Sequence, residues 1–143
     1  MDPYATHLPV LVREALQARG PILELGCGDY STQVLAEIAQ HVEQPFFFYS
    51  ADPVWSARYP AIQKLLVNWS SVKFPTADIV FLDNEQFTKD RIRHLPALAL
   101  TSRVVVVHDL GACSSHAHWR ESVAAWPIVE TYPQHNTAVL RRN

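Results

Sequence analysis

Polar residues and glycines follow five short apolar runs, and their residue types could bind a ligand or catalyse a reaction. The five segments are Gly26–Asp29, Ser50–Asp52, Asn68–Trp69, Asp83–Asn84 and His108–Asp109. In an open parallel sheet the carboxyl ends of the strands lie along one edge, and ligands bind outside that edge. The sequence therefore predicts that these segments meet in one site.

His108 and the two aspartates Asp83 and Asp109 are the candidates for catalysis. A histidine titrates near neutral pH, so His108 could remove a proton from a hydroxyl or an amine. Neighbouring residues of a strand point to opposite faces, so His108 and Asp109 are not expected to act as a pair. Asp83 ends an apolar run and could face a ligand or cap the helix that follows. We predict catalytic roles for all three.

Metal ligation is a second chemistry open to this part of the chain. Ligand types that suit zinc or another borderline metal gather at His108, Asp109, Cys113, His116 and His118. Their spacing matches no compact metal motif, and Ser115 is expected to begin a helix. The sequence therefore predicts no metal site.

Helical and strand patterns alternate along the chain, and this alternation determines how the candidate residues are held. Strands are expected at Ile22–Leu25, Pro45–Tyr49, Leu65–Asn68, Asp78–Leu82 and Val104–Val107, with a closing hairpin of Ile128–Tyr132 and Thr137–Arg141. Helices are expected at Leu8–Ala18, from Ser31 or Thr32 onward, at Val54–Tyr59, at Glu85–Leu100 with a break at Pro96 left open, and at Ser115–Ala125. On the helix at Glu85–Leu100, Lys89, Arg91 and Arg93 are expected to form a solvated face.

This order of elements predicts a three-layer, Rossmann-like α/β fold. The sheet is mostly parallel, with helices on both faces and a C-terminal antiparallel hairpin. We expect a single domain over residues 1–143, with an N-terminal helix within 1–20 and the core in 21–143. The hairpin and the 10% of aromatic residues would suit a homodimer.

Composition excludes several classes of protein. Hydrophobic residues make up 48% of the chain and charged residues 18%, which is a globular rather than a disordered composition. The net charge of -2 and the lack of a long basic run argue against a nucleic-acid surface. Two cysteines are too few for a disulfide framework, so we expect a reduced, cytoplasmic protein. The apolar runs are too short to span a membrane, and no signal peptide is expected.

The run from Ile22 to Thr32, ILELGCGDYST, resembles motif I of class I S-adenosylmethionine-dependent methyltransferases. Further segments resemble, in order, the later strands of a small methyltransferase-like group within that family; they are Tyr49–Trp55, Asp78–Asn84, Val104–Asp109 and Asn136–Leu140. The resemblance implies S-adenosylmethionine as the cofactor, held on a glycine turn where backbone approaches the ligand closely. The cofactor-binding residues implied are Glu24, Gly26, Cys27, Gly28, Asp29, Ser31, Ser50, Asp52, Asn68, Trp69 and Asp83.

Two positions depart from the family pattern. Tyr30 stands where a third glycine is common, and its ring could crowd the loop or cover the ligand. Ser50 stands where the family has an acidic residue that bonds both ribose hydroxyls, and Asp52 lies two residues further on. Whether Ser50 or Asp52 takes that role stays open at this point. Asn68 and Trp69 could hold and stack the adenine.

Methyl transfer to a small-molecule or protein acceptor is the leading functional prediction. A non-catalytic module that binds a nucleotide cofactor or a partner is the first alternative, which Tyr30 and Ser50 favour. A nicotinamide oxidoreductase is another, because both classes use a glycine turn. A hydrolase of the nucleophile-elbow type is not expected, since the chain has no Gly-x-Ser-x-Gly sequence.

Overall fold

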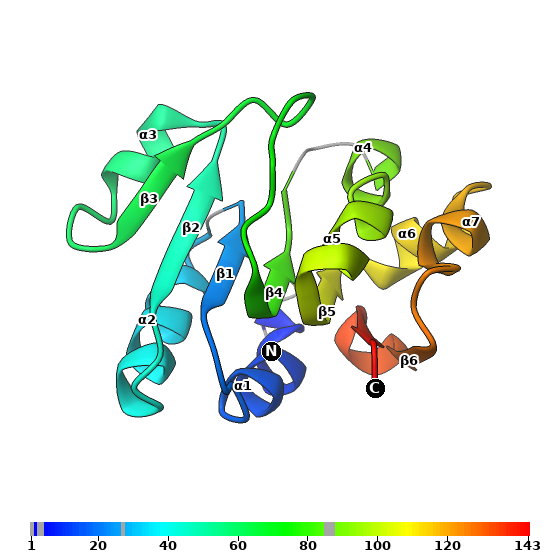
Figure 1. The fold of residues 1–143 in the computed structure, drawn as a ribbon, viewed down its shortest axis with the longest axis horizontal. Coiled ribbons are helices and arrows are strands. Elements are labelled where there is room, and N and C mark those ends of the chain that lie inside the picture. The colour runs from blue at the N-terminus through cyan, green and yellow to red at the C-terminus, as the bar shows by residue number, and fades with distance from the viewer. Residues whose placement is uncertain (1, 3–4, 27, 85–87) are drawn as a thin grey trace.

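A seven-stranded sheet in the order β3-β2-β1-β4-β5-β7-β6 forms the centre of the molecule (Figure 1). The computed structural model describes residues 2, 5–26, 28–84 and 88–143. The strands are β1 Ile22–Leu25, β2 Phe46–Ser50, β3 Gln63–Leu66, β4 Ala77–Leu82, β5 Ser102–His108, β6 Ile128–Tyr132 and β7 Thr137–Arg141. Strands β1 to β5 pair in parallel, and β7 pairs antiparallel with both β5 and β6.

The central strands are buried on both faces, as their sequences require. Every residue of β1 is buried, and Val104–Val107 of β5 are fully buried. Continuous apolar runs of this kind are typical of parallel strands covered by helices on both sides. The sheet therefore divides the core into two clusters, one on each face.

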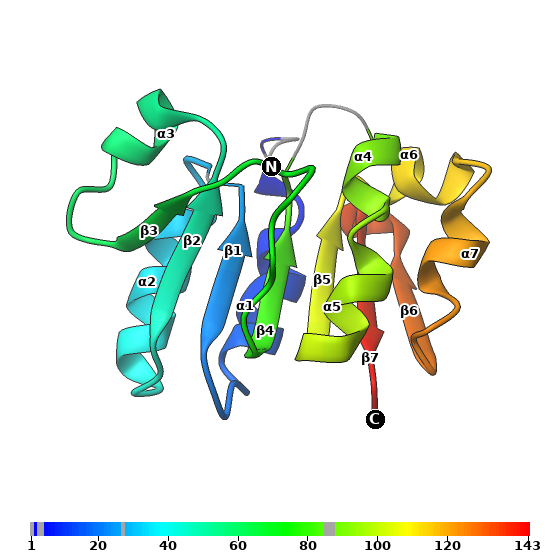
Figure 2. The ribbon, with the colours of Figure 1, turned by 45° about the horizontal axis from the view of Figure 1, so that its top comes forward.

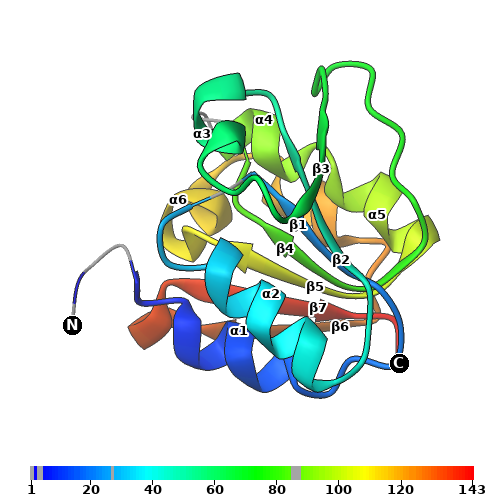
Figure 3. The same cartoon turned by 90° about the vertical axis from the view of Figure 1, so that its left-hand side faces the viewer.

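Helices cover the two faces unequally (Figure 3). Helices α1 Leu8–Ala15 and α2 Thr32–His41 pack on one face. The other face carries α4 Thr88–Ile92, α5 Leu95–Thr101, α6 Leu110–Ser115 and α7 Trp119–Val123. The short helix α3 Pro53–Ala57 follows β2 and lies beyond its carboxyl end (Figure 2). The predicted three-layer fold with a mostly parallel sheet and a C-terminal hairpin is confirmed.

The terminal hairpin enters the sheet with its second strand inward. Strand β7 lies between β5 and β6, so β6 becomes the edge strand. A short 3-10 turn, Pro133–His135, and Asn136 with a left-handed φ of 48° join the two strands. Asparagine tolerates this backbone region better than most residues.

Several predicted boundaries were wrong. The helix expected at Glu85–Leu100 is two helices, α4 and α5, and they separate at Arg93–His94 rather than at Pro96. Pro96 lies in the first turn of α5, where its missing N–H has no intrahelical role. Residues 85–87 of that prediction lie outside the described residues.

The helix expected to begin at Ser115 is also two helices, and Ser115 ends the first of them. Asp109 adopts a left-handed conformation, so the chain leaves β5 and starts α6 at once. The helix expected at Leu8–Ala18 ends at Ala15. The third strand lies at Gln63–Leu66, two residues before the predicted Leu65–Asn68. Among the described helices, none has the length and apolar character needed to cross a membrane.

Candidate functional site

Two adjoining hollows lie along the carboxyl edge of the sheet, where the strand ends of Figure 2 meet α3 and the start of α2. The first hollow measures about 350 Å³ and the second about 400 Å³, and Trp55 and Asp83 line both. Predicted residues that line the first hollow are Gly26, Ser50, Asp52, Trp69, Asp83 and Asn84. Those that line the second are Gly28, Asp29, Ser31, Asp83 and His108. The structure thus brings together most of the residues that the sequence singled out.

Gly26 lets the end of β1 lie directly against the end of β4. Its φ is +84°, a backbone conformation that side chains rarely adopt. A Cβ at this position would lie 2.9 Å from the Cα of Asn84, which real contacts do not allow. The Gly26 N–H also donates to the carbonyl of Tyr49 at 2.8 Å. The turn therefore requires glycine here; Cys27, its neighbour in the prediction, lies outside the described residues.

Glu24 ties this turn to the start of α2. Its side chain is fully buried, and Oε1 accepts a hydrogen bond from the Ser31 hydroxyl. Burial raises the pKa of Glu24 to about 8, opposed by hydrogen bonds from Ser31 and Thr32. The Glu24 carboxyl is therefore mostly neutral at pH 7. Its Oε2 has no hydrogen-bond partner among the residues described.

Ser50 and Asp52 occupy the end of β2 on the wall of the first hollow. The buried Ser50 hydroxyl accepts the Asp52 N–H at 3.0 Å and lies 3.2 Å from the Asp52 carbonyl. Asp52 is exposed, and its Oδ1 caps α3 by accepting N–H groups of Val54 and Trp55 at 2.8 and 3.3 Å. The Ser50 hydroxyl is therefore engaged in the turn, whereas Asp52 presents a carboxylate to the hollow.

Asn68 and Trp69 are neighbours in the sequence, but only Trp69 lines a hollow. Trp69 lines the first hollow, and its ring centroid lies 6.0 Å from that of His94. The Asn68 side chain instead accepts hydrogen bonds from the N–H and hydroxyl of Ser70, at 3.0 and 2.6 Å. Asn68 is exposed and lines neither hollow, because its side chain closes the local turn.

Tyr30 leaves the second hollow open. Its hydroxyl donates to Asp2 Oδ2 at 2.6 Å, and 38% of the residue is exposed. The ring therefore forms part of the wall and does not fill the space. Asp29 lies beside it at the rim, in an exposed ion pair of 3.0 Å with Arg58.

Asp83, His108 and Asp109 meet at the ends of β4 and β5. His108 Nδ1 lies 3.3 Å from Asp83 Oδ2, and His108 Nε2 lies 3.8 Å from Asp109 Oδ1. The expectation that His108 and Asp109 point to opposite faces was wrong. Asp109 has a φ of 59° and is no longer in the strand, so its carboxylate turns back toward the imidazole.

Arg91 is a site residue that the sequence analysis misread as solvated. Its guanidinium pairs with Asp83 Oδ1 at 3.1 Å and Asp109 Oδ2 at 2.8 Å, and its side chain is 8% exposed. It also donates to the carbonyls of Asn84 and His108, at 2.8 and 3.2 Å. Opposed by burial, the Arg91 hydrogen bond holds the pKa of Asp109 below its ordinary value. Residue type and spacing gave no sign that Arg91 faces inward.

The side chains that could ligate a metal lie in two separate places. Asp83, His108 and Asp109 each offer one atom within 4.8 Å of the others, but the Arg91 guanidinium already lies against both carboxylates. His116 and His118 lie together on a separate segment, with ring centroids 5.5 Å apart and the rings tilted by 38°. Burial raises the pKa of the Cys113 thiol to about 11, and its sulfur lies 3.6 Å from the His108 carbonyl. The prediction of no metal therefore stays a prediction, and Arg91 supplies positive charge between the two aspartates.

His7 is the second residue that the sequence analysis missed. It precedes α1, lines the second hollow and is 3% exposed. Its ring contacts the rings of both Phe81 and His108, with centroid distances of 4.8 and 4.4 Å. No spacing in the sequence connects position 7 with the strand ends, so only the fold reveals this contact.

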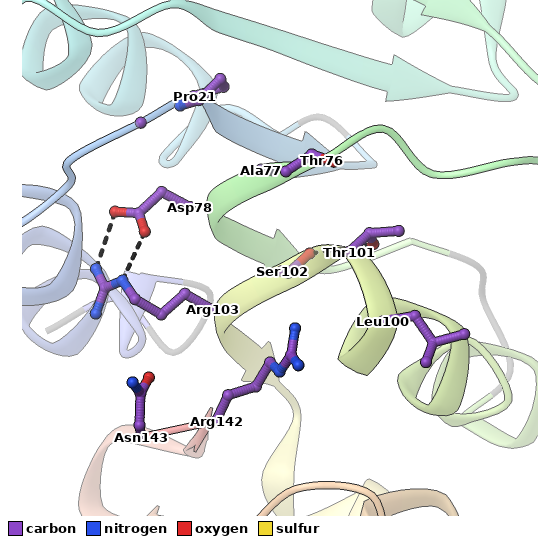
Figure 4. Close-up of a pocket in the computed structure, with 11 residues that line it drawn as sticks. Pro21, Thr76, Ala77, Asp78, Leu100, Thr101, Ser102, Arg103, Arg142 and Asn143 are labelled. Carbon is purple, nitrogen blue, oxygen red and sulfur yellow. Dashed lines mark hydrogen bonds and ion pairs between the residues drawn. The ribbon is translucent and has the colours of Figure 1, made fainter.

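A larger hollow lies at the opposite, amino edge of the sheet (Figure 4). It measures about 560 Å³, and Asp78 and Arg103 face each other on its wall through bonds of 2.6 and 2.9 Å. Although burial opposes ionisation, the Arg103 guanidinium and the Arg19 amide lower the pKa of Asp78. Within the described part of the chain, no buried side-chain atom that lacks a partner lines this hollow.

The fold is that of class I methyltransferases. One similar structure is the O-methyltransferase TomG from Streptomyces achromogenes, solved with S-adenosylmethionine. The match covers 100% of the present chain and 81% of the TomG chain, with 20% sequence identity and a TM-score of 0.63. Cofactor-bound Rv0187 from MTB is also similar: the match covers 100% of the present chain and 81% of the Rv0187 chain, with 18% sequence identity and a TM-score of 0.61.

The MycE methyltransferase of the mycinamycin pathway, solved with Mg and S-adenosylhomocysteine, is a longer protein. It matches 96% of this chain with 13% identity and a TM-score of 0.65. The present chain spans about half of MycE, 48% of its length. No protein-family model and no curated protein sequence matches the chain.

Proposed function

We propose that this chain binds S-adenosylmethionine in the two hollows and transfers its methyl group to an acceptor. One observation carries the proposal: two adjoining hollows meet at Asp83 on the carboxyl edge of a class I methyltransferase fold. Ligands of open α/β sheets bind at this edge. The single domain, the cytoplasmic location and a homodimer remain predictions beside it.

The first hollow suits an adenosine. The Asp52 carboxylate can accept hydrogen bonds from ribose hydroxyls, and Trp55 and Trp69 offer aromatic faces to a base. Ser50 supports this arrangement by fixing the Asp52 backbone through its hydroxyl. We therefore assign the ribose contact to Asp52 and a supporting role to Ser50.

The second hollow suits the methionine part of the donor and the acceptor. Gly28 and Ser31 lie where α2 begins, and the free N–H groups of a helix start favour a carboxylate. Glu24 holds Ser31 there as a mostly neutral hydrogen-bond partner. Asp83, shared by both hollows, lies where the two parts of the donor would join.

Bound S-adenosylmethionine would supply a methyl group on a positively charged sulfur. The chain's own contribution is to hold the acceptor in line with that group, and such positioning can supply several kcal/mol of the barrier. Asp83 and Asp109 put negative charge near the sulfonium position, and Arg91 and His108 keep the two carboxylates fixed. The acceptor, a small molecule or an exposed protein side chain, would enter beside His108.

Calorimetry with two ligands tests the proposal. We expect S-adenosylmethionine and S-adenosylhomocysteine to bind the wild type, and to bind Asp52→Ser about tenfold more weakly, the loss of one good hydrogen bond. Serine can still cap α3, so the variant keeps its fold. Glu121→Ser, at an exposed carboxylate on α7, is the matched control and should bind as the wild type does.

Two results would contradict the assignments. Equal affinities of wild type and Asp52→Ser would remove Asp52 from the ribose contact. Failure of both ligands to bind the folded wild type would overturn the proposed function itself. A labelled-methyl assay with cell extract then tests transfer: incorporation that needs the protein supports catalysis, and binding without incorporation favours a non-catalytic module.

A further inference from the structure

The amino edge of the sheet carries two hollows that share one wall. The hollow in Figure 4 measures about 560 Å³, and a second hollow beside it measures about 670 Å³. Asp78, Arg103 and Asn143 line both of them. Within the described part of the chain, no buried side-chain atom that lacks a hydrogen-bond partner lines either hollow, so nothing there indicates a buried ligand. The features that distinguish this edge are exposed ones.

The ion pair of Asp78 and Arg103 fixes the backbone on both sides of the shared wall. Bonds of 2.6 and 2.9 Å join the carboxylate and the guanidinium. The Asp78 carboxylate also accepts the Arg19 N–H at 2.7 Å, and the Arg103 carbonyl accepts the Arg142 N–H at 3.1 Å. Arg19 and Arg142 are therefore held in place by their backbones, and these bonds do not engage their side chains.

The side chains of Arg19 and Arg142 add positive charge to this edge. Arg19 lines the larger hollow, and Arg142 extends from the end of β7 into the hollow of Figure 4. Both residues are exposed, and neither guanidinium has a hydrogen-bond or salt-bridge partner among the residues described. Of the charged side chains that line the two hollows, three are arginines and one is an aspartate. This surface is therefore complementary to an acidic partner.

An exposed leucine accompanies each of these two arginines. Leu16, at the C-terminal end of α1, lines the larger hollow and is 48% exposed. Leu100, in α5, lines the other hollow and is 81% exposed, the highest value among the large exposed hydrophobic residues described. Single exposed apolar residues are common, but two leucines in adjoining hollows form an apolar surface that a partner can bury.

The types of side chain at this edge favour a protein partner over a nucleic acid. The basic residues are arginines, which are enriched at protein interfaces, and the large apolar ones are leucines. Among the described residues, no aromatic side chain lines either hollow, so a base would find no aromatic ring on which to stack. A peptide segment with acidic and aliphatic side chains complements both the charge and the apolar character of the surface.

We propose that the two hollows at the amino edge form a docking surface for an acidic segment of another protein that also carries aliphatic side chains. Its carboxylates pair with Arg19 and Arg142, and its aliphatic side chains cover Leu16 and Leu100. The surface lies at the edge of the sheet opposite to the hollows of the proposed function, so a docked partner leaves those hollows open. The inference therefore does not depend on methyl transfer.

Selection from a peptide library tests the charge of the partner. The probe is a phage library of random dodecapeptides, which is first depleted on the double variant Arg19→Gln/Arg142→Gln and then selected on the wild type. Both substitutions change exposed side chains and keep the backbone N–H groups, so the double variant should unfold at the same temperature as the wild type. We expect the selected peptides to be enriched in acidic and aliphatic residues relative to the starting library.

Calorimetry with the most enriched peptide tests the leucine contact, which the depletion step does not select. We expect Leu100→Ser to weaken binding about fivefold, the effect of truncating one interface residue of moderate importance. Val54→Ser, on α3 and 71% exposed in wild type, is the matched control and should bind as the wild type does. Raising the salt concentration from about 0.05 M to about 0.5 M should weaken binding several-fold, because salt screens exposed charges.

Several results would overturn the inference. Loss of every peptide in the depletion step would mean that the two arginines bind no acidic segment, and enrichment in basic residues would give the partner the wrong charge. Equal affinities of wild type and Leu100→Ser would remove the leucine from the contact. A wild type that sediments as a dimer, with Leu100→Ser as a monomer, would mean that a second copy of the chain covers this edge. A monomeric wild type supports a different protein as the partner.

Discussion

The hollows at the two edges of the sheet differ in size and in how their polar groups are satisfied. At the amino edge two hollows measure about 560 and 670 Å³, and the charges of Asp78 and Arg103 are paired on the wall that they share (Figure 4). At the carboxyl edge the hollows measure about 350 and 400 Å³, and both ring nitrogens of the buried His7, which lines one of them, have no hydrogen-bond partner within the described residues. Volume alone would select the amino edge.

The comparison teaches that unsatisfied buried polar atoms mark a binding site better than empty space does. A hollow costs little when solvent fills it, whereas each buried unpaired group costs about 1–3 kcal/mol. Such a cost persists where a ligand completes the hydrogen bonds. The carboxyl edge carries this cost, and the amino edge, whose central charges are paired, does not.

Glycine substitutions should give the largest difference in stability loss between the two edges of the sheet. Gly26→Ala forces a side chain into a φ of +84° and against the Asn84 backbone, so we expect a loss of about 5 kcal/mol or failure to fold. Gly20→Ala, at the amino edge, meets only Asp78 Cβ at 3.2 Å and should cost about 1 kcal/mol. Urea unfolding measures the free energy of unfolding of both variants. Equal losses would contradict the difference between the two edges.

Arginine substitutions form the next pair. Arg91→Met removes a buried guanidinium that pairs with two partly exposed carboxylates, Asp83 and Asp109, and that also donates to two backbone carbonyls, so we expect about 2 kcal/mol of destabilisation. Arg103→Met removes a partly exposed pair with Asp78 and should cost about 1 kcal/mol. Thermal unfolding at one pH compares the two. A smaller loss at Arg91 than at Arg103 would argue against an inward-facing Arg91.

Glu24 should make stability fall as pH rises. Its folded pKa of about 8 lies above the ordinary 4.5, so its stabilising contribution is complete below pH 4.5 and is lost between about pH 4.5 and pH 8. Glu24→Gln, which stays neutral, should gain about 3 kcal/mol relative to wild type across that range. Denaturant unfolding at pH 5 and pH 9 measures the difference, and parallel pH curves would contradict the buried neutral carboxyl.

His7 should have the opposite and smaller dependence. Its folded pKa of about 4 lies below the ordinary 6.5, so protonation favours the unfolded chain and stability falls as pH drops from 6.5 to 4. In His7→Phe, the loss of unfolding free energy on acidification should be smaller than in wild type by about 2 kcal/mol. Comparing unfolding free energies at pH 7 and pH 4.5 checks this, with His41→Phe as the exposed control. If stability falls between pH 7 and pH 4.5 by the same amount in His7→Phe as in wild type, His7 is not buried as a neutral ring.

Local sequence determined the strands and most of the site. Apolar runs bounded by glycine or polar residues identified β1, β2, β4 and β5, because a strand buried on both faces tolerates little else. Their carboxyl ends supplied Gly26, Ser50, Asp52, Asp83 and His108, all of which line the hollows. The closing hairpin followed from two strand patterns around a proline turn. These features are local, so a window of residues is enough to reveal them.

Tertiary structure alone decided the rest. Arg91 faces inward because α4 packs against the end of β5, and His7 reaches His108 because α1 packs beneath β4 and β5. The left-handed Asp109 turns its carboxylate toward His108, which alternation along a strand does not predict. Each of these contacts joins segments distant in sequence or depends on one backbone angle. Such information is absent from residue type and spacing, and it arises only when the chain is packed.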